Sequence, residues 1–160
     1  MGDRESAAAR ASAYRADSKA AQQRMLEALT QLGGVALLLL TGSGRATLCA
    51  APVERAERTM ADARRHLRAA SPPDNAAHHH RHLSRAAAAL ERAIAQAFAC
   101  MSMRGGRDEQ DRLSTLLRAA SDELQRAGRI VPGFETVDLR EACCAWHRAA
   151  PAARFSATAC

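Results

Sequence analysis

The chain has 160 residues, of which 48% are hydrophobic but only 3% aromatic, and its formal net charge is +6. This length suits one domain around one continuous core. Alanine and leucine carry most of the apolar content, and both are strong helix formers, so the composition favours packed helices over sheets. Acidic residues are interleaved with the arginines along most of the chain, which argues against the concentrated basic stripe of a nucleic-acid-binding protein.

The amino-terminal residues do not have the pattern of a cleaved export signal, because 1–12 contain Asp3 and Glu5 and no apolar run. The longest apolar stretch, 35–40, is too short to span a membrane. Five cysteines, two of them adjacent, do not resemble the disulfide framework of a secreted protein. We therefore expect a cytoplasmic protein with reduced thiols and no membrane span.

The first half of the chain predicts two helices separated by the breakers of 41–44. Apolar residues recur at steps of three and four over 17–41, and the same spacing continues over 52–70. Pro52 suits the first turn of the second helix, where its missing N–H is not needed. The predicted core positions are Met25, Leu29, Leu32, Ala36 and Leu39 in the first helix, and Val53, Ala56, Met60, Ala63, Leu67 and Ala70 in the second.

The second half predicts two more helices. Ser71, two prolines and Asp74 are typical of a helix start, and Gly105-Gly106 closes that third helix. Asp108 is the expected cap of a fourth helix, which Pro132-Gly133 stops. The predicted core positions are Leu83, Ala87, Leu90, Ile94, Ala97 and Met101 in the third helix, and Leu113, Leu117, Ala120, Leu124 and Ala127 in the fourth.

Short connections between helices of one period predict an all-α, up-down antiparallel four-helix bundle over 17–130. The spacing around Asp138 predicts a short fifth helix within a carboxy-terminal docking segment, 131–150. We expect 1–16 to be a flexible amino-terminal segment and 151–160 a flexible tail.

Histidines and cysteines form two clusters that carry the chemistry available to this chain. His78 and His82 lie one helical turn apart at the start of the third helix, and Cys143 and His147 have the same spacing in the predicted fifth helix. If the terminal segment folds back over that end of the bundle, imidazoles and thiols converge on one zinc or copper site. The further candidate ligands are His66, His79 and Cys144.

A third interpretation concerns phosphoryl transfer. His80-Arg81 is similar to the His-Arg start of some histidine-kinase dimerisation helices, and this similarity implies a phosphate-relay bundle. The similarity ends after two residues, and no glycine-rich nucleotide loop is present in the sequence.

The sequence contains no recognisable catalytic set and favours a non-enzymatic interaction or accessory protein. Such a protein binds a protein partner, or a second copy of itself, through exposed helix faces. The alternative is a metal-binding or metal-sensing bundle that uses the histidine and cysteine clusters.

Overall fold

A computed structural model describes residues 2–41, 45–102 and 106–136 of this chain. These residues form four α-helices and one short 3₁₀ turn. In chain order the elements are α1 (Gly2–Thr41), α2 (Arg45–Ala69), η1 (Asp74–Ala76), α3 (Ala77–Met101) and α4 (Arg107–Ile130).

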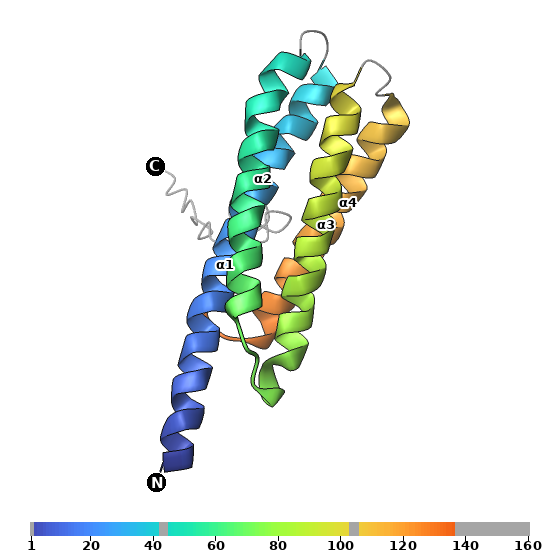
Figure 1. Cartoon of the computed structure of the whole chain (residues 1–160). Coiled ribbons are helices and arrows are strands. Elements are labelled where there is room, and N and C mark those ends of the chain that lie inside the picture. The colour runs from blue at the N-terminus through green and yellow to red at the C-terminus, as the bar shows by residue number, and fades with distance from the viewer. Residues whose placement is uncertain (1, 42–44, 103–105, 137–160) are drawn as a thin grey trace, which may run out of the picture.

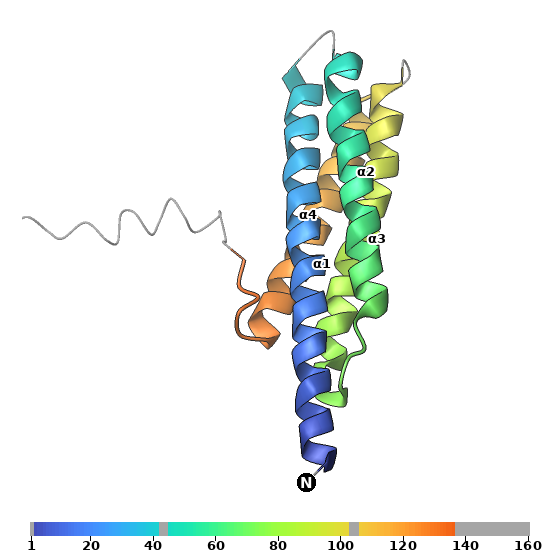
Figure 2. The same ribbon diagram turned by 60° about the vertical axis from the view of Figure 1, so that its left-hand side comes forward.

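The four helices alternate in direction, and their contacts are consistent with an up-down bundle (Figure 1). α1 packs closely against α2, and α3 packs closely against α4. α1 also contacts α3 and α4, whereas α2 and α4 do not meet within the described residues. α1 therefore touches every other helix, and its lower part extends beyond them (Figure 2).

Residues at helical spacing on all four helices build one apolar core. In α1 the buried side chains include Met25, Leu32 and Val35. In the other helices the predicted positions are mostly buried as well, so the three-four spacing is confirmed as the signal for the core. Five predicted core positions are only partly buried: Leu29, Ala36, Leu67, Met101 and Leu117.

α1 is longer than the sequence spacing predicts, because it begins at Gly2 rather than at residue 17. Residues 2–16 therefore belong to α1, and the expected flexibility of this segment stays a prediction. Residues 7–13 are mostly alanine, which has the highest helix propensity. Tyr14, with an exposed fraction of 3%, then anchors this part of the helix against the bundle.

α2 also begins earlier than predicted, at Arg45, so Pro52 lies inside the helix and not in its first turn. A proline inside a helix removes one N–H donor, and here the carbonyl of Leu48 lacks that partner. Val53, which follows Pro52, is fully buried. Core packing on both sides of the proline holds the helix together at this point.

α3 and α4 begin at residues other than the predicted caps. Pro73 disfavours helical geometry at Pro72, so the chain first makes η1 and enters α3 at Ala77 instead of at Ser71. α4 is capped by Gly106 and not by Asp108. The backbone N–H of Gly106 donates to Glu109 Oε2 at 2.9 Å, which satisfies a donor at the helix start.

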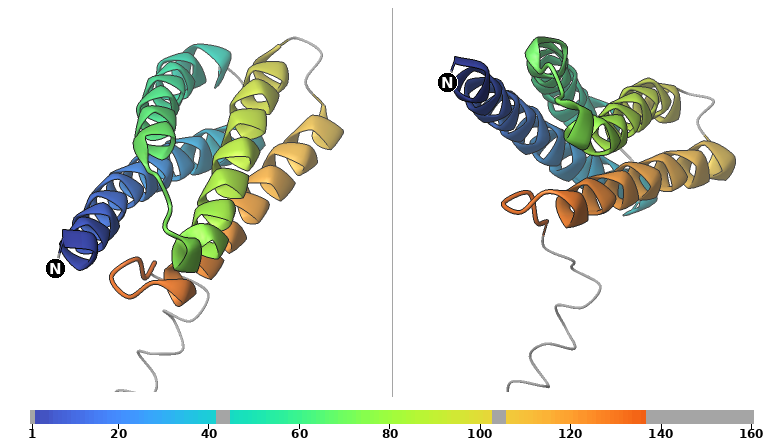
Figure 3. Two further views of the ribbon diagram at one scale, coloured as in Figure 1. Left: turned by 60° about the horizontal axis from the view of Figure 1, so that its bottom comes forward. Right: turned by 90° about the horizontal axis from the view of Figure 1, so that it is seen from below.

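The turn 131–136, which follows α4, folds back against α1 (Figure 3). Gln22 Nε2 donates to the carbonyl of Phe134 at 2.7 Å, and Lys19 Nζ donates to the carbonyl of Gly133. A side-chain carbon on Gly128 would lie 2.5 Å from the Phe134 oxygen, so only glycine allows this approach. The predicted fifth helix and the tail, 137–160, lie outside the described residues.

Within the described residues, one helix is long and apolar enough to cross a membrane by length and composition alone. It is the part of α1 from Ser6 to Thr41, where one 18-residue window has a mean hydropathy of 1.3. Of that window, 28% is buried inside the bundle. Much of the apolar surface of α1 is therefore not used by the core.

Candidate functional site

The histidines at the start of α3 point in different directions and form two separate clusters. His79 faces the interior, where it meets Tyr14 and the turn after α4. His82 faces α4 and meets Glu123, while His78 lies one turn before it on the same side. One run of histidines therefore supplies a buried group and a partly open one.

His79 is a buried side chain in contact with two aromatic rings. Its Nδ1 atom lies 2.7 Å from the hydroxyl of Tyr14, and its ring packs edge-on against Phe134 with centroids 4.5 Å apart. Burial, together with the nearby charges of His80 and His82, lowers the pKa of His79 to about 4. His79 is therefore neutral near pH 7 and acts as part of the core.

Tyr14 keeps its proton at neutral pH because burial raises its pKa. Its hydroxyl can therefore donate to Nδ1 of His79, which places the histidine proton on Nε2. Nε2 is buried and has no hydrogen-bond partner within the described residues. This leaves one unsatisfied polar atom beneath the turn that follows α4.

His78 and His82 bring two imidazole nitrogens together. Their Nε2 atoms are 3.2 Å apart, whereas their ring centroids are 4.6 Å apart, so the nitrogen edges of the two rings converge. On the other side of the His82 ring, Nδ1 lies 2.5 Å from Glu123 Oε2. His82 is buried and His78 is exposed, so the pair is open to solvent from the His78 side.

Glu123 is held as a carboxylate between His82 and Arg126. Burial acts to raise its pKa, but the hydrogen bonds and charges of His82 and Arg126 together lower it below the usual value. Arg126 Nη1 donates to Glu123 Oε1 at 2.6 Å, which leaves Oε2 for His82. Because a carboxylate only accepts hydrogen bonds, the proton of this contact belongs to Nδ1 of His82.

The structure does not bring His66 or His79 to this pair. His66 lies on α2 with its Nδ1 atom 3.5 Å from Asp17 of α1, and His79 turns inward to Tyr14. Cys143, Cys144 and His147 lie outside the described residues. Within the residues that the structure describes, no three His, Cys, Asp or Glu side chains are grouped to hold a metal ion.

His80, the residue that suggested a phosphate relay, is half-buried beside the contact between Tyr14 and His79. Its ring lies 6.1 Å from that of Tyr14, and burial lowers its pKa. Its Nδ1 atom is buried and has no hydrogen-bond partner in the described part of the chain.

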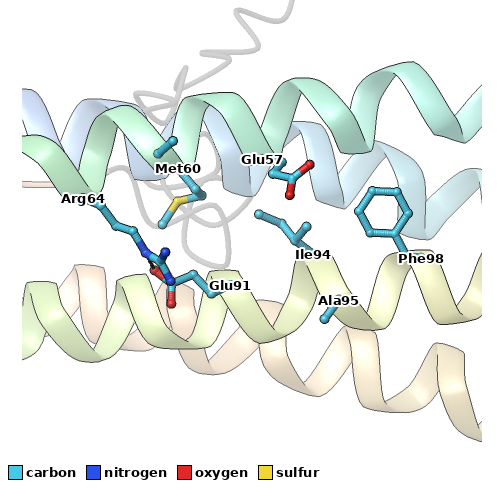
Figure 4. Close-up of a pocket in the computed structure, with 8 residues that line it drawn as sticks. Glu57, Met60, Arg64, Glu91, Ile94, Ala95 and Phe98 are labelled. Carbon is cyan, nitrogen blue, oxygen red and sulfur yellow. Dashed lines mark hydrogen bonds and ion pairs between the residues drawn. The ribbon is translucent and has the colours of Figure 1, made fainter.

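A groove of about 390 Å³ runs between α2 and α3 (Figure 4). Arg64 and Glu91 form an ion pair at one end, and Phe98 stands at the other. Met60 and Ile94 form the floor between them. The groove is mainly apolar, and the Arg64–Glu91 ion pair forms its polar end.

The upper part of α1 carries a second apolar stripe beside the one that faces the core, and we name it the α1 leucine face. Leu37 and Leu40 have exposed fractions of 66% and 60%, while Leu26 and Leu29 lower on the same stripe are half-buried. A side-chain carbon added at Gly33, between them, would meet no atom within 4 Å. The α1 leucine face consists of Leu26, Leu29, Gly33, Ala36, Leu37 and Leu40.

Sequence reasoning missed the two partners that give the histidines their roles. Tyr14 lies 65 residues before His79, and Glu123 lies 41 residues after His82. The only sequence signal for Tyr14 is that it is the single tyrosine, in a segment otherwise composed of small and polar residues. Glu123 has no local signal, because its place depends on the register of α4 against α3.

No protein-family model, curated protein or solved structure matches this chain.

Proposed function

We propose that this protein is a non-enzymatic helical bundle that associates with a second copy of itself through the α1 leucine face. The observation that carries the proposal is the exposure of Leu37 and Leu40 on a well-formed helix. Each leucine gains about 1.5–3 kcal/mol when it is fully buried, so two adjacent exposed leucines favour a covering partner.

The α1 leucine face is complementary to itself in an antiparallel crossing at Gly33. In that crossing Leu37 of one copy lies opposite Leu29 of the other, and Leu40 lies opposite Leu26, because each pair of numbers is centred on residue 33. Protruding leucines then meet half-buried ones. Gly33, which has open space around it, allows the two helix backbones to approach closely at the centre.

Two copies of this chain also repel each other, since each carries a formal charge of +6. A face formed by a single helix is small compared with the interfaces of permanent dimers. These two features favour a weak, reversible dimer that becomes tighter when salt screens the charges.

The test is the molar mass of the full chain in solution, measured by light scattering over a range of micromolar concentrations. The wild-type mass should rise from 17.1 kDa toward twice that value as concentration increases. Leu37→Glu should remain monomeric because a charge then lies opposite Leu29 of the other copy, within the apolar contact. Leu38→Glu is the matched control, because Leu38 is exposed but lies on another side of α1, and it should behave as wild type.

A second variant distinguishes the specific helix crossing from non-specific hydrophobic association. Gly33→Leu adds apolar surface, so it should strengthen non-specific association but weaken a dimer that needs close approach at residue 33. Equal weakening by Leu37→Glu and Leu38→Glu would contradict the proposal, as would tighter association of Gly33→Leu.

If the chain's own carboxy-terminal segment or a lipid surface covers the α1 leucine face in place of a second copy, the measured molar mass distinguishes these cases. The segment 137–150, for which the sequence predicts a short helix, follows the turn that is fixed to Gln22 and Lys19, just below Leu26. If that helix covers the face, the full chain stays monomeric and a chain ending at residue 136 dimerises. If a lipid surface covers it, the chain stays monomeric and sediments with vesicles. Either result would refute self-association.

A further inference from the structure

We propose that His78 and His82 form a two-nitrogen binding site for a divalent transition metal, with Glu123 as the residue that orients His82. The site lies in the first two turns of α3, and these are at the opposite end of the bundle from the last turns of α1, which carry Leu37 and Leu40 (Figure 1). It is therefore independent of the proposed self-association.

The distance between the two imidazole nitrogens suits a shared metal ion. Metal–nitrogen bonds of about 2.0–2.1 Å place two ligands on one ion roughly 3.0–3.4 Å apart, depending on the coordination angle. The observed separation of the two Nε2 atoms is 3.2 Å. An ion could enter by a small displacement of the exposed His78, without any change in the helix backbone.

Glu123 supplies the outer-sphere contact that metal-binding histidines commonly have. It accepts the Nδ1–H of His82, so the Nε2 atom of His82 keeps its lone pair on the side that faces His78. Arg126 holds the other oxygen of the same carboxylate, which fixes its direction. The His82 ring is thus oriented from behind before any ion binds.

The ligand type points to copper, nickel or zinc rather than magnesium or calcium. Neutral imidazoles suit the former ions, whereas the latter prefer oxygen ligands. Two protein ligands leave the remaining coordination positions to water or to another small ligand. Such a site binds reversibly and differs from a closed structural zinc site with four protein ligands.

The test is calorimetric titration of the folded full chain with Ni²⁺ under reducing conditions. Ni²⁺ is chosen because it binds imidazole well and does not oxidise thiols as Cu²⁺ does. His78→Ala should reduce the affinity by about tenfold or more, and Glu123→Gln should also weaken binding by about tenfold. His78 is exposed, so its replacement should leave the circular dichroism and the melting temperature of the metal-free protein unchanged.

Two further variants make the result specific. His66→Ala removes a histidine that contacts Asp17 on another part of the bundle, and it should bind Ni²⁺ as the wild type does. Cys143→Ser should also leave the affinity unchanged. If the wild type binds no Ni²⁺, or if His78→Ala binds as tightly as the wild type, the proposal is wrong. It is equally wrong if Cys143→Ser abolishes binding.

Discussion

His79 is buried with its Nδ1 atom 2.7 Å from the Tyr14 hydroxyl, and the burial of this ring makes stability depend on pH. The pKa of His79 is about 4 in the folded protein and about 6.5 in the unfolded chain. Between these values the unfolded chain binds the proton more readily, so stability is complete above about pH 6.5 and falls as the pH drops toward about 4.

His79→Phe should therefore make stability less sensitive to pH in this range. The urea midpoints of both proteins, measured at about pH 7.5 and about pH 5, give the comparison. The wild type should lose more stability than the variant between these two pH values. Some sensitivity should remain in the variant, because burial also lowers the pKa of His80. An equal loss in both proteins would show that His79 is not the group responsible.

Leu90 and Leu117 look alike in the sequence, but the structure separates them. Leu90 is fully buried, whereas Leu117 only packs against the edge of the core. We expect Leu90→Ala to cost about 2–5 kcal/mol and Leu117→Ala on the order of 1 kcal/mol, because less apolar surface is lost at the edge. Denaturant unfolding of both variants measures the difference, and equal costs would contradict the burial of these residues.

At the scale of the elements, alanine substitutions at two helix glycines should have opposite effects on stability, because only Gly128 lies against the turn after α4. Gly128→Ala should destabilise the protein by about 1–3 kcal/mol, because the new methyl group collides with the backbone of Phe134. Gly34→Ala meets no atom within 4 Å and should stabilise α1 by about 0.5–1 kcal/mol through helix propensity. Thermal unfolding of both variants checks the opposite signs. If Gly128→Ala were also stabilising, the close approach of Phe134 would be wrong.

The sequence predicts which segments are helical better than it predicts where each helix begins. The apolar spacing marks the core stripes because burial selects side chains at every turn of a helix. The first residue of a helix depends on weaker local effects, such as capping and proline geometry. These effects explain why α3 begins only at Ala77, after Pro73, and why Gly106 caps α4. The early start of α1 depends on Tyr14, whose partner His79 is remote in sequence.

For the whole molecule, the all-α class and the four-helix arrangement follow from one repeated period and from short connections. The candidate sites can be predicted from the sequence only in part. The His78–His82 pair is readable from a spacing of four residues, but its contact with Glu123 requires the register between α3 and α4. The α1 leucine face cannot be predicted from the sequence either. α1 has two apolar stripes, and the positions of the other helices determine which of them faces the core.

Self-association through the α1 leucine face is the central claim, and sedimentation equilibrium tests it most directly. We expect the full chain to have an average mass between 17.1 kDa and twice that value at micromolar concentration. Raising the salt from about 0.05 M to about 0.5 M should increase this mass, because screening weakens the repulsion between two copies of charge +6. A mass that stays at 17.1 kDa at every concentration and both salt levels would contradict the account.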